Sequence, residues 1–128
     1  MTPETEYKRK FLVLIDDTPE CDRAVTFAAH RVKRTGGTVV LLSVIETADF
    51  QQFLGVEEVM RAEAREEAER LIAEDPGIAI LVLAASPSKD GPGPLVTAFA
   101  GRSGLGALPI LITIVPSSMT DEQIVAVA

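Results

Sequence analysis

The sequence predicts a single α/β domain, doubly wound, in which helices sandwich a mostly parallel sheet. Four apolar segments, residues 11–15, 38–45, 78–84 and 110–115, have the unbroken hydrophobicity of strands that are covered on both faces. Segments with helical periodicity separate them, which is the strand–helix–strand alternation of parallel α/β folds. The chain has 128 residues, 47% of them apolar, so residues 1–128 suit one domain with a sizeable core.

The first two helices have recognisable ends. After the first strand, Thr18 can act as the N-cap and Pro19 suits the first helical position. Gly36 can close that helix before the second strand begins. The next helix runs from Val56 to about residue 74, where an Asp-Pro-Gly sequence stops it.

Two shorter helices complete the pattern. One covers residues 95–100 after the third strand, and the glycine-rich stretch 101–108 leads from it into the last strand. The other covers residues 121–128, where Thr120 and Gln123 have the spacing of a capping box.

Composition and charge exclude several classes of protein. The formal net charge of −7 disfavours binding to nucleic-acid phosphates or to an anionic membrane surface. No apolar run approaches the roughly 20 residues of a membrane-spanning helix. Asp16 interrupts the first apolar run too early for a signal peptide, and a single cysteine allows neither an internal disulfide nor a cysteine-based zinc site. A cytoplasmic protein is the expectation.

The acids that end the first strand are the first candidate site. In parallel sheets ligands bind beyond the carboxyl ends of the strands, where Asp16 and Asp17 stand. Such a pair can hold magnesium or accept hydrogen bonds from a ligand. The alternative, equally open from the sequence, is that the two acids only organise the start of the helix that follows.

A loop rich in glycine and proline follows the third strand. Ser86 begins it, Gly91 and Gly93 would let the backbone approach phosphates, and Lys89 could add a cation. Three prolines each remove one N–H donor from the same loop. Further on, Arg102 could clamp a phosphate. The single histidine leaves no visible catalytic base, so no catalytic residue is predicted.

Taken in order, these segments resemble the universal stress protein family. The resemblance rests on residues 11–16 with the amphipathic helix after them, on residues 37–45, on the third strand with its loop, and on residues 109–115. It covers most of residues 10–116. It implies a flavodoxin-like or Rossmann-like sheet, a dimer, and the ATP binding of many family members.

The same resemblance implies where a nucleotide would lie. Nucleotide-binding members carry Gly-x2-Gly-x9-Gly-Ser/Thr, and Gly91 and Gly101 have the spacing of its second and third glycines. Ser88 replaces the first glycine, and Arg102 precedes the hydroxyl of Ser103. By position, Asp16 would contact the adenosine and Val44 the adenine. The implied cofactor is ATP or AMP with magnesium, bound weakly. The candidate binding residues are Asp16, Asp17, Val44, Ser86, Ser88, Lys89, Gly91, Gly93, Gly101, Arg102 and Ser103.

One departure from the family is structural. The family has a further strand and helix between the second helix and the strand at residues 78–84, and neither is found here. Either the chain is naturally shortened or the sequence skips a segment near Arg70. The family strand order 3-2-1-4-5 then becomes 2-1-4-5. The second strand, residues 38–45, is left as an apolar edge of the sheet.

These observations predict a small stress protein that acts as a dimeric binding or signalling module. The last strand, from Ile110 to Val115, is apolar on both faces and would form the homodimer contact, as is common in the family. Two alternatives stay open: a protein-interaction dimer of the same fold that binds no nucleotide, and a slow magnesium-dependent ATPase in which Asp16 or Asp17 holds the metal.

Overall fold

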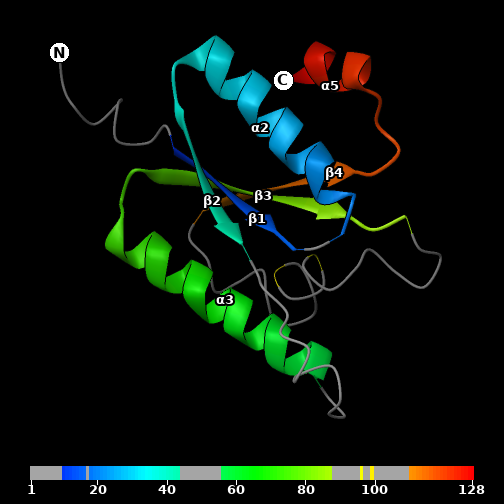
Figure 1. Ribbon diagram of the computed structural model, residues 1–128. Coiled ribbons are helices and arrows are strands. Elements are labelled where there is room, and N and C mark those ends of the chain that lie inside the picture. The colour runs from blue at the N-terminus through cyan, green and yellow to red at the C-terminus, as the bar shows by residue number, and fades with distance from the viewer. Residues whose placement is uncertain (1–9, 17, 44–55, 88–95, 97–98, 100–109) are drawn as a thin grey trace, which may run out of the picture.

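A four-stranded parallel sheet forms the centre of the molecule (Figure 1). The computed structural model describes residues 10–16, 18–43, 56–87, 96, 99 and 110–128. The strands are β1 (Lys10–Ile15), β2 (Thr38–Ser43), β3 (Ile78–Ala85) and β4 (Leu111–Pro116). Their order is β2-β1-β3-β4 and every pair is parallel, which confirms the order predicted for a sheet without the family's additional strand.

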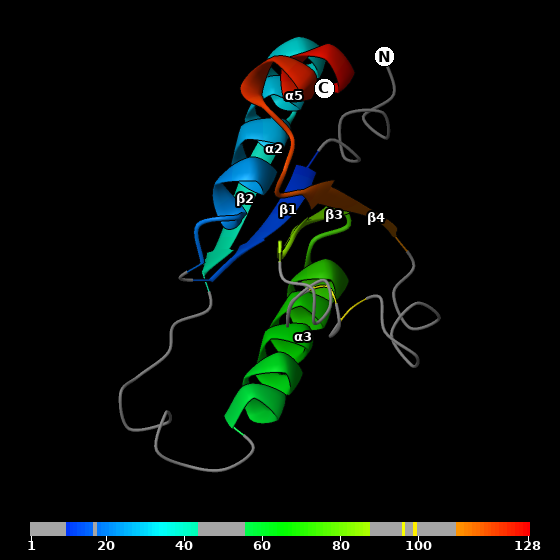
Figure 2. The ribbon, with the colours of Figure 1, turned by 90° about the vertical axis from the view of Figure 1, so that its right-hand side faces the viewer.

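Helices cover both faces of the sheet, as the doubly wound fold requires. Helices α2 (Cys21–Thr35) and α5 (Asp121–Val127) lie side by side on one face, and α3 (Val56–Glu74) lies on the other (Figures 1 and 2). The two crossovers from β1 to β2 and from β2 to β3 run in opposite directions along the sheet. Their helices therefore lie on opposite faces, because both crossovers have the same hand.

Alternation along the strands divides the core into two layers. Successive side chains of a strand point to opposite faces, so β1 and β3 contribute to both layers. The layer beneath α2 contains Phe11, Val13, Val82 and Phe27. The layer on the α3 side is built mainly by these buried residues: Leu12, Leu14, Ala68, Leu81, Leu83, Val96 and Phe99.

The start of α2 differs from the sequence prediction. Thr18 and Pro19 precede the helix and form a tight turn, in which the N–H of Cys21 donates to the Thr18 carbonyl at 3.3 Å and the N–H of Asp22 donates to that of Pro19 at 3.2 Å. The Thr18 hydroxyl donates to the Asp16 carboxylate and so does not cap the helix. At the other end Gly36 adopts the left-handed conformation predicted for it, with φ of 81°.

Arginines of α2 hold the C-terminal helix in place. The predicted capping box is confirmed, since the N–H of Gln123 donates to Thr120 and the N–H of Thr120 donates to Gln123. At the end of α5, Arg31 and Arg34 donate to the carbonyl of Ala128, with Nε–O distances of 2.5 and 2.9 Å. These contacts satisfy carbonyls that the last turn of a helix leaves without partners.

An ion pair links the end of α3 to the beginning of the sheet. Lys10 Nζ lies 2.7 Å from Asp75 Oδ2, and the N–H of Gly77 donates to Asp75 Oδ1 at 2.9 Å. The hydrogen bond from Lys10 is the main reason why the pKa of Asp75 is lowered. This pair closes the turn between α3 and β3.

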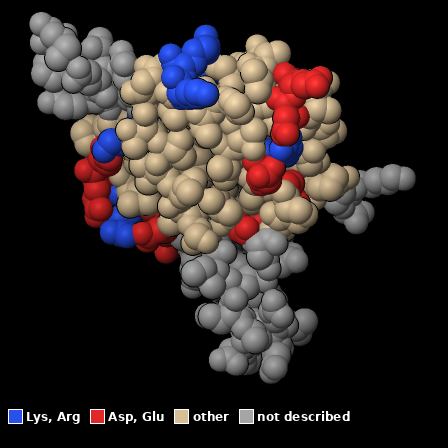
Figure 3. Space-filling view, turned by 45° about the horizontal axis from the view of Figure 1, so that its top comes forward, with Lys and Arg blue, Asp and Glu red and all other residues tan. Residues whose placement is uncertain are grey.

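The described part of the face that carries α2 and α5 shows no large field of one charge (Figure 3). On the face that carries α2 and α5, charged side chains lie mostly around the rim and a broad uncharged area lies between them (Figure 3). Of the helices in the described ranges, none has the length and apolar character that a bilayer span needs.

Candidate functional site

The strand order reverses between β1 and β3. Strand β1 has β2 on one side and β3 on the other, and the helices that lead to these two neighbours lie on opposite faces. Such a switch point leaves a crevice at the carboxyl ends of the two strands, where open α/β sheets bind ligands. Asp16 follows β1 and Ser86 follows β3, so the structure brings these two predicted residues to the same edge of the sheet.

The carboxylate of Asp16 organises the turn before α2. Its Oδ1 accepts hydrogen bonds from the N–H of Thr18 at 2.9 Å, from the Thr18 hydroxyl, and from Cys21 Sγ at 3.1 Å. The N–H of Asp16 in turn donates to Cys21 Sγ at 3.3 Å. The sequence left open whether Asp16 organises the start of the helix. Its Oδ1 does so, through these three hydrogen bonds.

Cys21 belongs to the core and is not a reactive thiol. Its side chain is 3% exposed in the layer on the α3 side. Burial, which disfavours the thiolate, raises the pKa of Cys21 to about 11. A thiol with that pKa is almost fully protonated at neutral pH and is a poor nucleophile.

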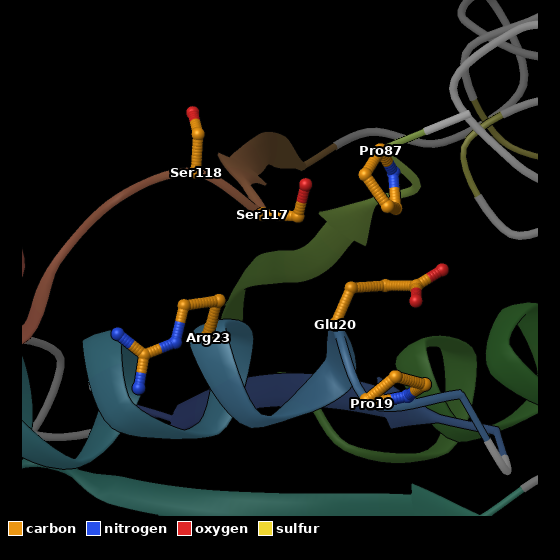
Figure 4. Close-up of a pocket in the computed structure, with 6 residues that line it drawn as sticks. All are labelled: Pro19, Glu20, Arg23, Pro87, Ser117 and Ser118. Carbon is orange, nitrogen blue, oxygen red and sulfur yellow. The ribbon is translucent and has the colours of Figure 1, made fainter. Parts of the chain in front are cut away.

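A shallow pocket of about 360 Å³ lies beside this edge of the sheet (Figure 4). The turn before α2 and the first turn of the helix form one wall, and the turns after β3 and β4 form the other. The carboxylate of Glu20 extends toward Pro87, whereas the guanidinium of Arg23 points in the opposite direction (Figure 4). The lining residues are Pro19, Glu20, Arg23, Pro87, Ser117 and Ser118.

Arg23 is held in the pocket wall by three acceptors. It forms ion pairs with Asp22 at 2.6 Å and with Asp121 at 2.7 Å, and Nη1 donates to the Met119 carbonyl at 3.0 Å. Hydrogen bonds to Asp22 and then to Asp121 raise the pKa of Arg23. The guanidinium therefore fixes the turn between β4 and α5 against the start of α2.

None of these pocket residues is among the binding residues predicted from the sequence. They come from three segments that are distant in the chain, and no local pattern marks them as parts of one binding site. The one available signal was positional: Ser117 and Ser118 follow a strand at the edge where parallel sheets bind ligands.

Most of the predicted binding residues lie outside the described residues. This holds for Asp17 and Val44 and for the candidates in the two glycine-containing loops, namely Ser88, Lys89, Gly91, Gly93, Gly101, Arg102 and Ser103. Ser86 is half-buried at the end of β3. Within the ranges that the structure describes, histidine, cysteine and acidic side chains form no group of three or more that could hold a metal ion.

Comparison with known families identifies this arrangement. The model of the universal stress protein family matches residues 8–105. The chain belongs to the universal stress protein family. Every binding residue predicted from the sequence lies inside the matched segment, whereas β4 and α5 lie beyond it. No curated protein and no solved structure matches the chain.

Proposed function

We propose that this universal stress protein binds ATP or AMP, with magnesium, at the carboxyl edge of its sheet and acts as a cytoplasmic binding or signalling module. The observation that carries the proposal is the juxtaposition of Asp16 and Ser86, which end the two strands on either side of the switch point. An unpaired cysteine buried in the core suits a cytoplasmic protein.

The chemistry of the edge supports a polar ligand. Three donors converge on Oδ1 of Asp16 and fix the orientation of the carboxylate. We assign the second oxygen, Oδ2, to the ribose hydroxyls, and the backbone around Gly91 to the phosphates. Prolines remove N–H donors from that loop, and Ser88 stands where nucleotide-binding members have a glycine. We therefore expect weak binding.

Titration calorimetry with ATP, ADP and AMP in the presence of magnesium tests this proposal. Binding that Gly91→Val abolishes supports it, since the added side chain would keep the backbone away from a phosphate. Val125→Ala is the control, because Val125 is 53% exposed on α5. No heat at millimolar nucleotide, from protein that is folded by circular dichroism, would exclude the nucleotide and favour the protein-interaction alternative.

A homodimer through β4 is the second part of the proposal. In the described part of the chain β4 is an edge strand, paired with β3 alone, and Leu111 and Ile114 are 70% and 40% exposed. Backbone pairing with a second copy would use the free edge and bury these side chains. We expect a mass above that of a single chain by light scattering, and a smaller mass for Leu111→Lys. A monomeric wild type would exclude this contact.

The ATPase alternative has its own assay. Release of phosphate from ATP above background, lost in Asp16→Ala, would indicate that the protein is a slow ATPase. Because Asp16 also accepts three hydrogen bonds in the turn before α2, the variant must first be shown to be folded.

A further inference from the structure

The opposite edge of the sheet is formed by β2, and nothing in that strand discourages pairing. Strand β2 is hydrogen-bonded to β1 alone within the described part of the chain. Its six residues, TVVLLS, include no charged residue, no proline and no glycine. Edge strands are normally protected by such residues, because their free N–H and C=O groups otherwise recruit another strand.

Side chains of β2 are more exposed than those of β1, because β2 has a neighbouring strand on one side only in the described part of the chain. Leu41 is 54% exposed, although Val13, its partner on β1, is fully buried. Val40 and Leu42 pack against the layer on the α3 side yet stay half-buried, whereas their neighbours on β1 are fully buried. Both layers of the core therefore reach β2 and are left incomplete there.

We propose that β2 pairs in antiparallel register with β2 of a second copy, around a two-fold axis at Leu41. Residues directly opposite each other in such a pair point to the same face. With the axis perpendicular to the sheet, the layer beneath α2 in one copy continues into the same layer of the other. This requires that odd-numbered residues of one copy lie opposite odd-numbered residues of the other, because alternate residues of a strand face opposite layers. A register centred on Leu41 meets this requirement.

This register places apolar side chains opposite apolar side chains. Leu41 would meet Leu41 of the second copy, and Val40 would meet the second copy's Leu42, so that each incomplete layer gains apolar neighbours. The strand carries no charge, so two chains of net charge −7 would meet without charged side chains opposite each other in these pairs. A second copy fits this edge better than a charged partner strand for the same reason.

This contact is separate from the one proposed at β4. The two strands are the opposite edges of the sheet, with β1 and β3 between them. An isologous contact at each edge would link copies into rows of more than two. Variants of Leu41 and of Leu111 therefore report on different contacts, and either proposal can fail while the other stands.

Disulfide trapping tests the β2 contact. Cα atoms of opposite residues in an antiparallel pair lie about 4.5–5.5 Å apart, within the range that a disulfide spans. In Leu41→Cys the new thiols of two copies would meet at the axis. The native Cys21 does not compete, since it is 3% exposed and its pKa is about 11. Val127→Cys is the matched control because Val127 is 55% exposed, against 54% for Leu41.

The expected result is rapid, register-specific cross-linking. An interface holds the thiols at an effective concentration near millimolar, so Leu41→Cys at about 10 μM should oxidise to a dimer on the order of 100 times faster than Val127→Cys. Ser43→Cys should remain monomeric on a denaturing gel, because Ser43 would lie opposite Val39. Equal rates for Leu41→Cys and Val127→Cys, or for Leu41→Cys and Ser43→Cys, would overturn the proposal.

A measurement without oxidation gives an independent answer. Leu41→Lys should lower the mass found by light scattering while the circular dichroism spectrum stays that of the wild type. Val127→Lys should leave the mass unchanged. If Leu41→Lys is folded and has the wild-type mass, β2 does not form a contact between copies.

Discussion

Truncation of Ile124 measures how firmly the C-terminal helix is packed. Ile124 is fully buried in the layer beneath α2. Ile124→Ala removes three carbon groups, each worth about 0.8 kcal/mol of burial, and leaves a cavity that adds to the loss. Arg31 and Arg34 still hold the Ala128 carbonyl, so the helix cannot easily move to fill the space. We expect a loss of about 3–4 kcal/mol.

Urea unfolding followed by circular dichroism gives this value directly. The free energy of unfolding should fall with little change in its dependence on urea, and the midpoint of thermal unfolding should fall by about 11–15 °C. Val125→Ala on the same helix is the control, since Val125 is 53% exposed and should cost less than about 0.5 kcal/mol. A loss below about 1 kcal/mol for Ile124→Ala would refute the packing of α5 on α2.

Three further predictions concern other contacts. Thr120→Ala, which breaks the capping box, should cost about 1 kcal/mol in urea unfolding. Asp75→Asn should destabilise the protein by at most about 1 kcal/mol at neutral pH, since the pair with Lys10 is partly exposed. Because the pKa of Asp75 is lowered in the folded protein, its contribution is present above the ordinary value of 3.8 and disappears as the pH falls through the folded value. Cys21, with its pKa of about 11, should resist iodoacetamide at pH 8 until the protein unfolds.

Each of the three predictions can be contradicted by a specific result. Thr120→Ser keeps the hydroxyl and should recover most of the stability; no difference between serine and alanine would argue against the cap. For Asp75→Asn, a gap from wild type that persists at acid pH would mean that the carboxylate charge is not what stabilises the turn. Rapid alkylation of Cys21 in folded protein would contradict its burial.

The local pattern was sufficient for the strands, for their order and for two of the helix ends. Unbroken apolar runs marked all four strands, and Gly36 and the Thr120 capping box ended or began helices where predicted. It was insufficient at the start of α2. Thr18 has the residue type of an N-cap, but the carboxylate of Asp16, two residues earlier, takes its hydroxyl instead. Propensity describes one residue at a time, whereas this hydrogen bond depends on how the chain leaves β1.

In the candidate site, too, some residues could be predicted from the sequence and others could not. The carboxyl ends of parallel strands are a property of the fold class, so Asp16 and Ser86 could be found from the sequence. The pocket beside them could not, because Arg23 and Ser117 come together only when α2 and the turn after β4 pack on the same face. Nor does the spacing of Arg31 and Arg34 reveal that they would hold a carbonyl more than 90 residues away.

By itself the sequence determined which segments become strands and helices, because periodicity and end signals act over a few neighbouring residues. It also determined the family and placed Asp16 and Ser86 at the same edge of the sheet. Tertiary structure alone decided the partners of the arginines of α2 and the degree to which Leu41 and Leu111 stay exposed. These features depend on the distance between segments far apart in the chain, which is set by packing and not by local propensity.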